Sequence, residues 1–111
     1  MVGVPGCVQV STTLPDENTA QRLGRSLVEE RLAACAQVAG PVSSTYWWRG
    51  AVEQSREWYC YLKTTRASFA ALSQRLKELH PYDVPEIIAV PIVEGSSEYL
   101  RWIEESLVVQ K

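Results

Sequence analysis

Two long runs of strand-forming residues flank Arg49-Gly50, and they constrain the fold of this 111-residue chain more than any other feature. Arg49-Gly50 has the composition of a tight hairpin turn. The two arms extend over Cys35–Trp48 and Val52–Thr65, up to about 14 residues each, whereas strands usually have five or six. Gly40-Pro41 interrupts the first arm, which is typical of a kink or bulge. The chain is therefore expected to contain a β-hairpin that projects from its domain.

The end of this hairpin carries three consecutive aromatic residues, Tyr46, Trp47 and Trp48. A small domain cannot cover so distant a tip with its own helices. Large aromatic side chains on a projecting element are typical of a surface that a partner covers. The alternative is a curled hairpin that packs its aromatic residues on its own domain, and we favour the partner surface over it.

Outside the hairpin, the apolar residues switch between the period of strands and the period of helices. The predicted elements are a strand over Cys7–Thr13, a helix entered through Leu14-Pro-Asp-Glu with the proline in its first turn, a helix over Ser68–Leu79, a strand over Glu86–Val93, and a last helix capped by Ser96 whose apolar stripe ends at Leu107. The order is β-α-β-β-α-β plus a C-terminal helix. Two β-α-β halves predict an α+β, ferredoxin-like sandwich, an antiparallel sheet with helices on one face, in a single domain over residues 1–111.

The stretch His80-Pro-Tyr-Asp-Val-Pro-Glu-Ile-Ile88 forms a stiff corner between the second helix and the last strand. Pro81 disfavours helical dihedral angles at His80, so the helix is expected to end there. The corner holds the only histidine together with Tyr82, Asp83 and Glu86. Polar groups on a rigid corner either build a site or only satisfy the backbone, and the residues alone leave both interpretations open.

Composition excludes several classes of function. The net charge is −2 with scattered Lys and Arg, so nothing favours nucleic acid as a partner. No apolar run approaches the ~20 residues of a membrane span, and Met1-Val-Gly-Val-Pro lacks the features of a signal peptide. Three cysteines without C-x-x-C spacing fit reduced thiols, so we expect a cytoplasmic protein.

Several short motifs together resemble the CutA divalent-cation tolerance proteins. They are His80-Pro-Tyr-x-Val-Pro-Glu-Ile-Ile, Thr12-Thr-Leu-Pro-Asp-Glu, Leu32-Ala-Ala-Cys35, Ser44-Thr-Tyr-Trp-Trp-Arg-Gly50, Lys63-Thr-Thr65, and Glu94-Gly95 with Tyr99-Leu-x-Trp102. The resemblance covers nearly the whole chain in order. It implies a ferredoxin-like domain assembled as a homotrimer, in which neighbouring subunits cover the open sheet face, and a role in tolerance to divalent cations, copper above all.

Two groups of residues could carry chemistry. The first group is polar and consists of Lys63, Tyr82, Glu86 and His80. These residues are expected to lie near one cleft, which a neighbouring subunit could close. Such a set can orient a small anionic or polar ligand, or form a structural hydrogen-bond cluster at an interface. We find no P-loop, dinucleotide motif or triad spacing, so the chain is not expected to be an enzyme.

The second group is a candidate metal site made of His80 with Cys35 or Cys60, since imidazole and thiolate suit copper. Some members of the family that this chain resembles carry a Cys where Thr12 stands and a second His where Leu79 stands. Of that set only His80 is present here. We therefore expect copper, or another divalent cation, to bind weakly.

Three functions compete on these grounds. The first is a trimeric, CutA-like protein of divalent-cation tolerance with weak copper binding, and we favour it. The second is a small-molecule binding or signalling module of the PII type, using clefts between subunits. The third is an enzyme that uses Lys63, Tyr82 and Glu86.

Overall fold

The computed structural model of the chain describes residues 6–108. Residues 1–5, on which the argument against a signal peptide rests, and residues 109–111 lie outside this range. The elements are β1 (Cys7–Leu14), α1 (Glu17–Glu29), β2 (Cys35–Trp48), β3 (Ala51–Thr65), α2 (Phe69–Leu79), β4 (Ile88–Ile92) and α3 (Ser97–Ser106). This order confirms the predicted α+β class.

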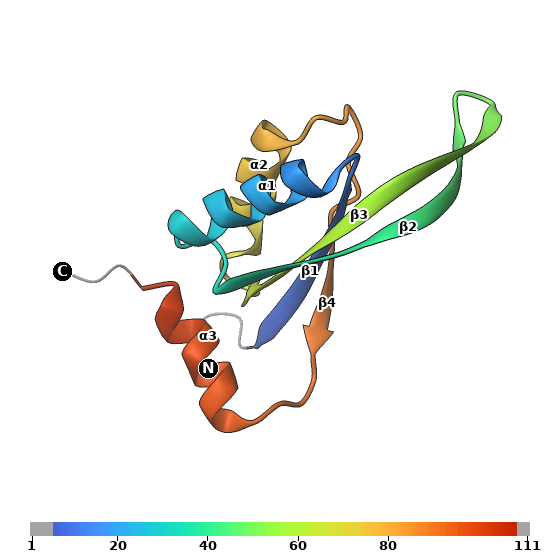
Figure 1. Cartoon of the computed structure of the whole chain (residues 1–111). Coiled ribbons are helices and arrows are strands. Elements are labelled where there is room, and N and C mark those ends of the chain that lie inside the picture. Colours follow the sequence, from blue (N-terminus) through green and yellow to red (C-terminus); the bar gives the residue numbers. More distant parts are fainter. Residues whose placement is uncertain (1–5, 109–111) are drawn as a thin grey trace.

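The four strands form one antiparallel sheet in the order β2-β3-β1-β4. This order confirms the ferredoxin-like arrangement. Helices α1 and α2 lie together on one face of the sheet, and α3 lies beyond the end where β1 begins (Figure 1). Pro91 lies in β4, at the edge of the sheet, where proline costs fewest ladder hydrogen bonds.

The hydrophobic core lies between α1, α2 and the face of the sheet that they cover. Alternate residues of β1 and β3 point into it, so Val8, Val10 and Leu62 are buried as the alternation predicts. The helices contribute Leu23, Leu27, Leu72 and Leu76. A smaller cluster of Cys7, Ala34 and Ile103 attaches α3 to the end of the sheet.

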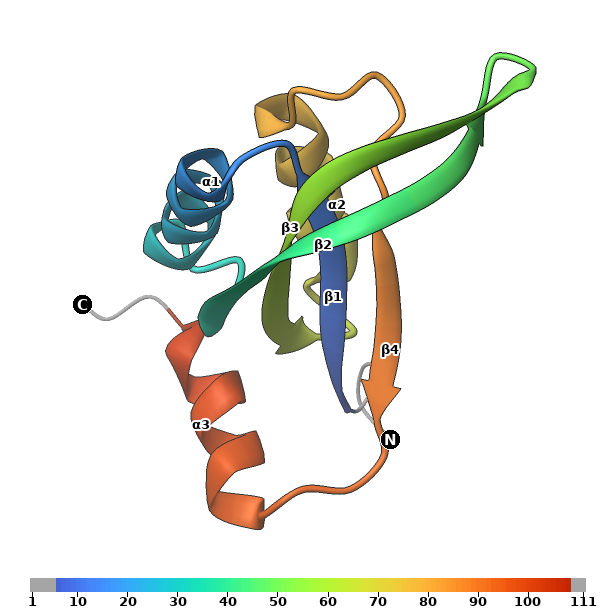
Figure 2. The ribbon, with the colours of Figure 1, turned by 45° about the vertical axis from the view of Figure 1, so that its right-hand side comes forward.

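The β2–β3 hairpin extends well beyond this core. Its strands have 14 and 15 residues, and the molecule measures 46 × 27 × 23 Å, so the hairpin accounts for the long axis. The ribbon bends as it leaves the sheet (Figure 2), and the pairing shifts between Ala39 and Val42, which confirms the bulge at Gly40-Pro41. A Cβ atom on Gly40 would come within 2.7 Å of the Trp58 ring, so this position requires glycine.

The tip of the hairpin is exposed. Arg49 and Gly50 both have positive φ, 52° and 83°, which confirms the tight turn. Trp47 is 75% exposed, and Tyr46 and Trp48 are also exposed. Within one chain the hairpin therefore does not pack all its aromatic residues on its own domain, and a large apolar surface remains uncovered.

Several boundaries differ from the sequence predictions, most of them by one residue. Strand β4 begins at Ile88 rather than Glu86, because Ile87 turns inward and packs against the core. Pro15 precedes α1 instead of entering its first turn, since the Asp16 side chain accepts the Thr19 N–H at 2.7 Å and caps the helix.

Leu107 caps the C-terminal end of α3 instead of lying inside the helix. Ser96 caps the other end, as predicted. Within residues 6–108, none of the helices combines the length and apolar character that a membrane crossing requires.

Candidate functional site

The corner after α2 places three of the predicted site residues. Helix α2 ends at Leu79, and His80 adopts extended dihedral angles (φ −78°, ψ 136°), as expected before Pro81. Residues 81–86 then pass opposite the outer half of the β2–β3 hairpin. The corner therefore faces the hairpin, not the end of β3 where Lys63 lies.

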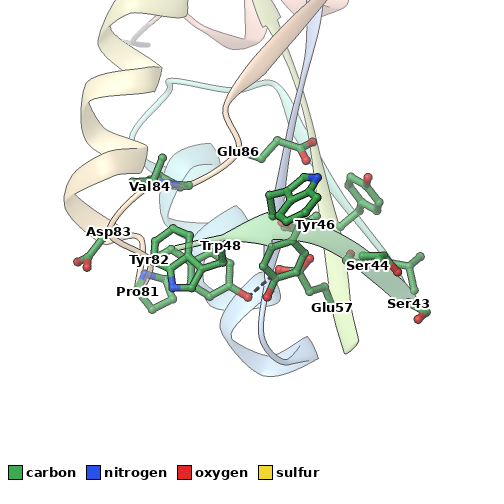
Figure 3. A pocket seen from close by; sticks show the side chains of 16 residues that line it. Ser43, Ser44, Tyr46, Trp48, Glu57, Pro81, Tyr82, Asp83, Val84 and Glu86 are labelled. Atoms are coloured by element: carbon green, nitrogen blue, oxygen red, sulfur yellow. Dashed lines mark hydrogen bonds between the residues drawn. The ribbon is translucent and has the colours of Figure 1, made fainter. Parts of the chain in front are cut away.

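A cleft of about 920 Å³ lies between this corner and the hairpin (Figure 3). We call it the hairpin cleft. Its walls come from β1, from the outer parts of β2 and β3, and from the corner. It is lined by Thr13, Val42, Ser43, Ser44, Thr45, Tyr46, Trp47, Trp48, Glu57, Tyr59, Pro81, Tyr82, Asp83, Val84, Pro85 and Glu86.

A hydrogen bond between Tyr82 and Glu57 ties the corner to β3. The Tyr82 hydroxyl donates to Glu57 Oε2 at 2.7 Å, shown as a dashed line in Figure 3. Glu57 is only 6% exposed, and no Lys, Arg or His among residues 6–108 forms an ion pair with it. Burial, followed by the neighbouring Glu57 carboxylate, raises the pKa of Tyr82, so its hydroxyl remains a donor at neutral pH.

Glu86 adds a second carboxylate to the cleft. Burial and the nearby Glu57 raise the pKa of Glu86 above its ordinary value. Glu86 in turn is the main cause of a raised pKa at Tyr59. Burial is the larger cause of the raised pKa at Glu86 and at Tyr82, and at Tyr82, Glu86 and Tyr59 a neighbouring carboxylate adds to the shift. The described residues that line the cleft include no Lys, Arg or His to balance this negative charge.

We expect Glu86→Gln to stabilise the protein at pH 7. A carboxyl group whose pKa is higher in the folded than in the unfolded state costs stability once both states are ionised. Below the ordinary Glu value of about 4.3 both states are protonated, so the gain disappears. Melting temperatures of wild type and Glu86→Gln between acidic and neutral pH test this, with Glu53→Gln, a change at an exposed position on β3, as control. A Glu86→Gln variant that is less stable at pH 7 would contradict the expectation.

His80 is buried, at 9% exposure, and both its ring nitrogens have partners. Nδ1 accepts the backbone N–H of Tyr82 at 3.1 Å. Nε2 lies 2.9 Å from Thr12 Oγ1, and because Nδ1 is an acceptor, the neutral ring carries its proton on Nε2. Burial is the main reason that the pKa of His80 is lowered, which keeps the ring neutral at pH 7.

Lys63 lies apart from the other predicted site residues. It is four residues beyond Tyr59 along β3, which corresponds to about 13 Å. Its ammonium group donates to Gln37 Oε1 at 2.7 Å on the neighbouring strand. Within one chain the structure thus brings together Tyr82 and Glu86 but not Lys63, which could reach such a cleft only from another copy of the chain.

The candidate copper ligands do not converge. Cys60 is buried in the core, and burial raises the pKa of its thiol to about 12. Cys35 instead lies beside α3, with its sulfur 3.9 Å from Tyr99 Oη. Residues 6–108 contain no group of three or more His, Cys, Asp or Glu side chains placed to hold a metal ion. The residues of one chain therefore do not fit a specific metal site, and His80 would have to give up a hydrogen bond to coordinate one.

Sequence reasoning missed Glu57, the most buried acid of the cleft. The two-residue period of the strand could have identified it, because this period places Glu57 on the same sheet face as Tyr59 and opposite to Trp58. This period cannot predict the hydrogen bond between Glu57 and Tyr82, because Tyr82 lies 25 residues further along the chain.

Fold and site together define a class of protein, a ferredoxin-like α+β domain with a long hairpin and an acidic, aromatic cleft. Residues 8–106 match the family model of the CutA1 divalent ion tolerance protein. The chain belongs to this family.

Individual relatives agree with this assignment. The divalent-cation tolerance protein CutA of Thermus thermophilus is 46% identical over 87% of this chain and 94% of its own length. That of Citrobacter koseri is 42% identical over 96% of this chain and 92% of its own. The crystal structure of CutA from Xylella fastidiosa superposes with a TM-score of 0.90 at 38% identity, covering 94% of this chain and all of that one.

Proposed function

We propose that this chain acts in divalent-cation tolerance as a homotrimer. The observation that carries the proposal is the exposed tip of the β2–β3 hairpin, where Trp47 is 75% exposed. Apolar side chains are also exposed on the sheet face opposite the helices. Ile88 pairs with Ser11 and Val90 with Gln9, so their side chains point away from the core.

A neighbouring copy would cover both surfaces at once. The hairpin provides an apolar projection, and β4 provides an open sheet edge to which another strand can bind. Obligate interfaces of this kind resemble a domain core cut in half, so assembly also stabilises each subunit. We further propose a cytoplasmic location, on the strength of the odd number of cysteines.

Copper binding by this protein is proposed to be weak. His80 is the one imidazole, it is engaged on both nitrogens, and the described residues contain no group of three or more possible ligands. Each absent ligand removes a bond that water replaces less well. Tolerance would then depend on the assembled protein and not on tight storage of the metal.

Calorimetric titration with Cu²⁺ is expected to give a dissociation constant of about 1 μM or weaker for the wild type. His80→Ala should weaken binding further, while the neighbouring Leu79→Ala serves as the control for local disturbance. Binding that survives His80→Ala and is lost in Cys35→Ser would assign the metal to the thiol. A stoichiometric nanomolar site that His80→Ala leaves unchanged would contradict the proposal.

A second candidate function is ligand binding, and the hairpin cleft supports it. A volume of about 920 Å³ lies in the range of small-molecule sites, and its lining includes Tyr82 and Glu86. In the proposed trimer a neighbouring subunit would close this cleft and could supply Lys63. A thermal-shift screen of small metabolites tests the function, because a ligand that binds only the folded state raises the melting temperature.

A further inference from the structure

We propose that the hairpin cleft binds a small organic cation, an ammonium or guanidinium group, between the aromatic rings of the hairpin and the carboxylates of Glu57 and Glu86. The inference rests on the ligand-binding role proposed above and names the chemical class of the ligand. It follows from the acidic lining of the cleft, in which Glu57 is the most buried carboxylate, and from its aromatic walls.

The charge of the cleft has one sign. Its lining includes Glu57, Asp83 and Glu86 but no Lys, Arg or His among the residues that the structure describes. Neighbouring carboxylates raise the pKa of Tyr59 and, after burial, that of Glu86. An anion would meet repulsion here unless another subunit supplied a base, whereas a cation would relieve the repulsion between the carboxylates.

Glu57 is a largely buried residue with one carboxylate oxygen open to the cleft, since only its other oxygen accepts a hydrogen bond and no fully buried side-chain oxygen among the described residues lacks a partner. It is 94% buried, one of its oxygens accepts the Tyr82 hydroxyl, and no basic residue in the 6–108 range forms an ion pair with it. A carboxylate removed from water is costly unless a positive charge or several donors balance it. Because Glu57 lines the cleft, a bound cation would supply that charge.

The aromatic walls favour an organic cation over a metal ion. Figure 3 shows Tyr46, Trp48 and Tyr82 grouped around Glu57, with Glu86 extending over them from the corner. Ring faces attract ammonium and guanidinium groups through their quadrupole but offer no lone pair to a metal. The tip already contains one such contact, since the Arg49 guanidinium lies 5.2 Å from the centre of the Trp48 ring.

Choline and its neutral analogue 3,3-dimethylbutan-1-ol form a matched pair of probes, because they share their shape and differ in charge. Calorimetric titration of the full chain in its assembled form, at low ionic strength, should show choline binding about tenfold more tightly than the alcohol. Glu57→Gln and Glu86→Gln should each reduce choline affinity about fivefold or more. Glu53→Gln, a change at an exposed position on the same strand as Glu57, should leave choline affinity within about twofold of wild type.

Choline binding no better than the alcohol, or choline affinity unchanged in both Glu57→Gln and Glu86→Gln, would overturn the inference. Circular dichroism of each variant verifies folding, and Glu86→Gln keeps the test decisive if Glu57→Gln does not fold. Citrate is the probe that separates the two proposals. Citrate binding that is lost in Lys63→Ala would retain the ligand-binding function and refute the cation, while failure of both probes in this cleft would count against both.

Discussion

Replacing Trp47 and Trp48 together by alanine is expected to convert the proposed trimer into smaller species at micromolar concentration. Both side chains are exposed at the hairpin tip in the single chain, and buried tryptophans at interfaces often contribute 2 kcal/mol or more each, by order of magnitude. The loss should appear as a lower mass by light scattering and as a melting temperature that depends on concentration.

The conservative variant Trp47→Phe/Trp48→Phe is the matched control, because it keeps aromatic surface at both positions. We expect it to remain largely assembled. A Trp47→Ala/Trp48→Ala variant that retains the mass and melting temperature of the wild type would show that the tip does not form the interface.

Leu76→Ala in α2 is expected to destabilise the protein by about 2–5 kcal/mol. Leu76 is fully buried between α2 and the sheet, so its truncation removes apolar contacts and leaves a cavity that the surroundings fill only in part. A change of this size lowers the melting temperature of a domain of about 100 residues by roughly 10 °C or more.

Lys77→Ala supplies the control for Leu76→Ala. Lys77 is the next residue of the same helix, it is exposed, and its helix propensity is close to that of leucine. Its replacement should change stability by no more than about 0.5 kcal/mol. Equal losses in the two variants would mean that the core is not organised around this face of α2.

The sequence predicted the fold well because the fold depends on local patterns. Alternation in β1 and β3, the turn at Arg49-Gly50, the bulge at Gly40-Pro41 and the end of α2 before Pro81 all arise from backbone sterics and side-chain period. The exposure of the hairpin tip was predicted from the length of the two hairpin strands alone. These features require no knowledge of distant contacts.

The candidate site was harder to predict because it depends on distances along strands and on long-range pairs. Tyr82 and Glu86 do share a cleft, but Lys63 is separated from it by part of the length of β3. Glu57 joined the site only through its hydrogen bond to Tyr82. The start of β4 was placed too early for a similar reason, since Ile87 leaves the sheet edge to pack on the core.

The mass of the wild-type protein in solution tests the central claim most directly. Light scattering coupled to gel filtration, on protein at micromolar concentration, should give three times the 12.5 kDa of a single chain. That result is expected because a lone chain leaves both the hairpin tip and the β4 face exposed. A mass of one chain under the same conditions would contradict the account, since both surfaces would then remain in contact with water.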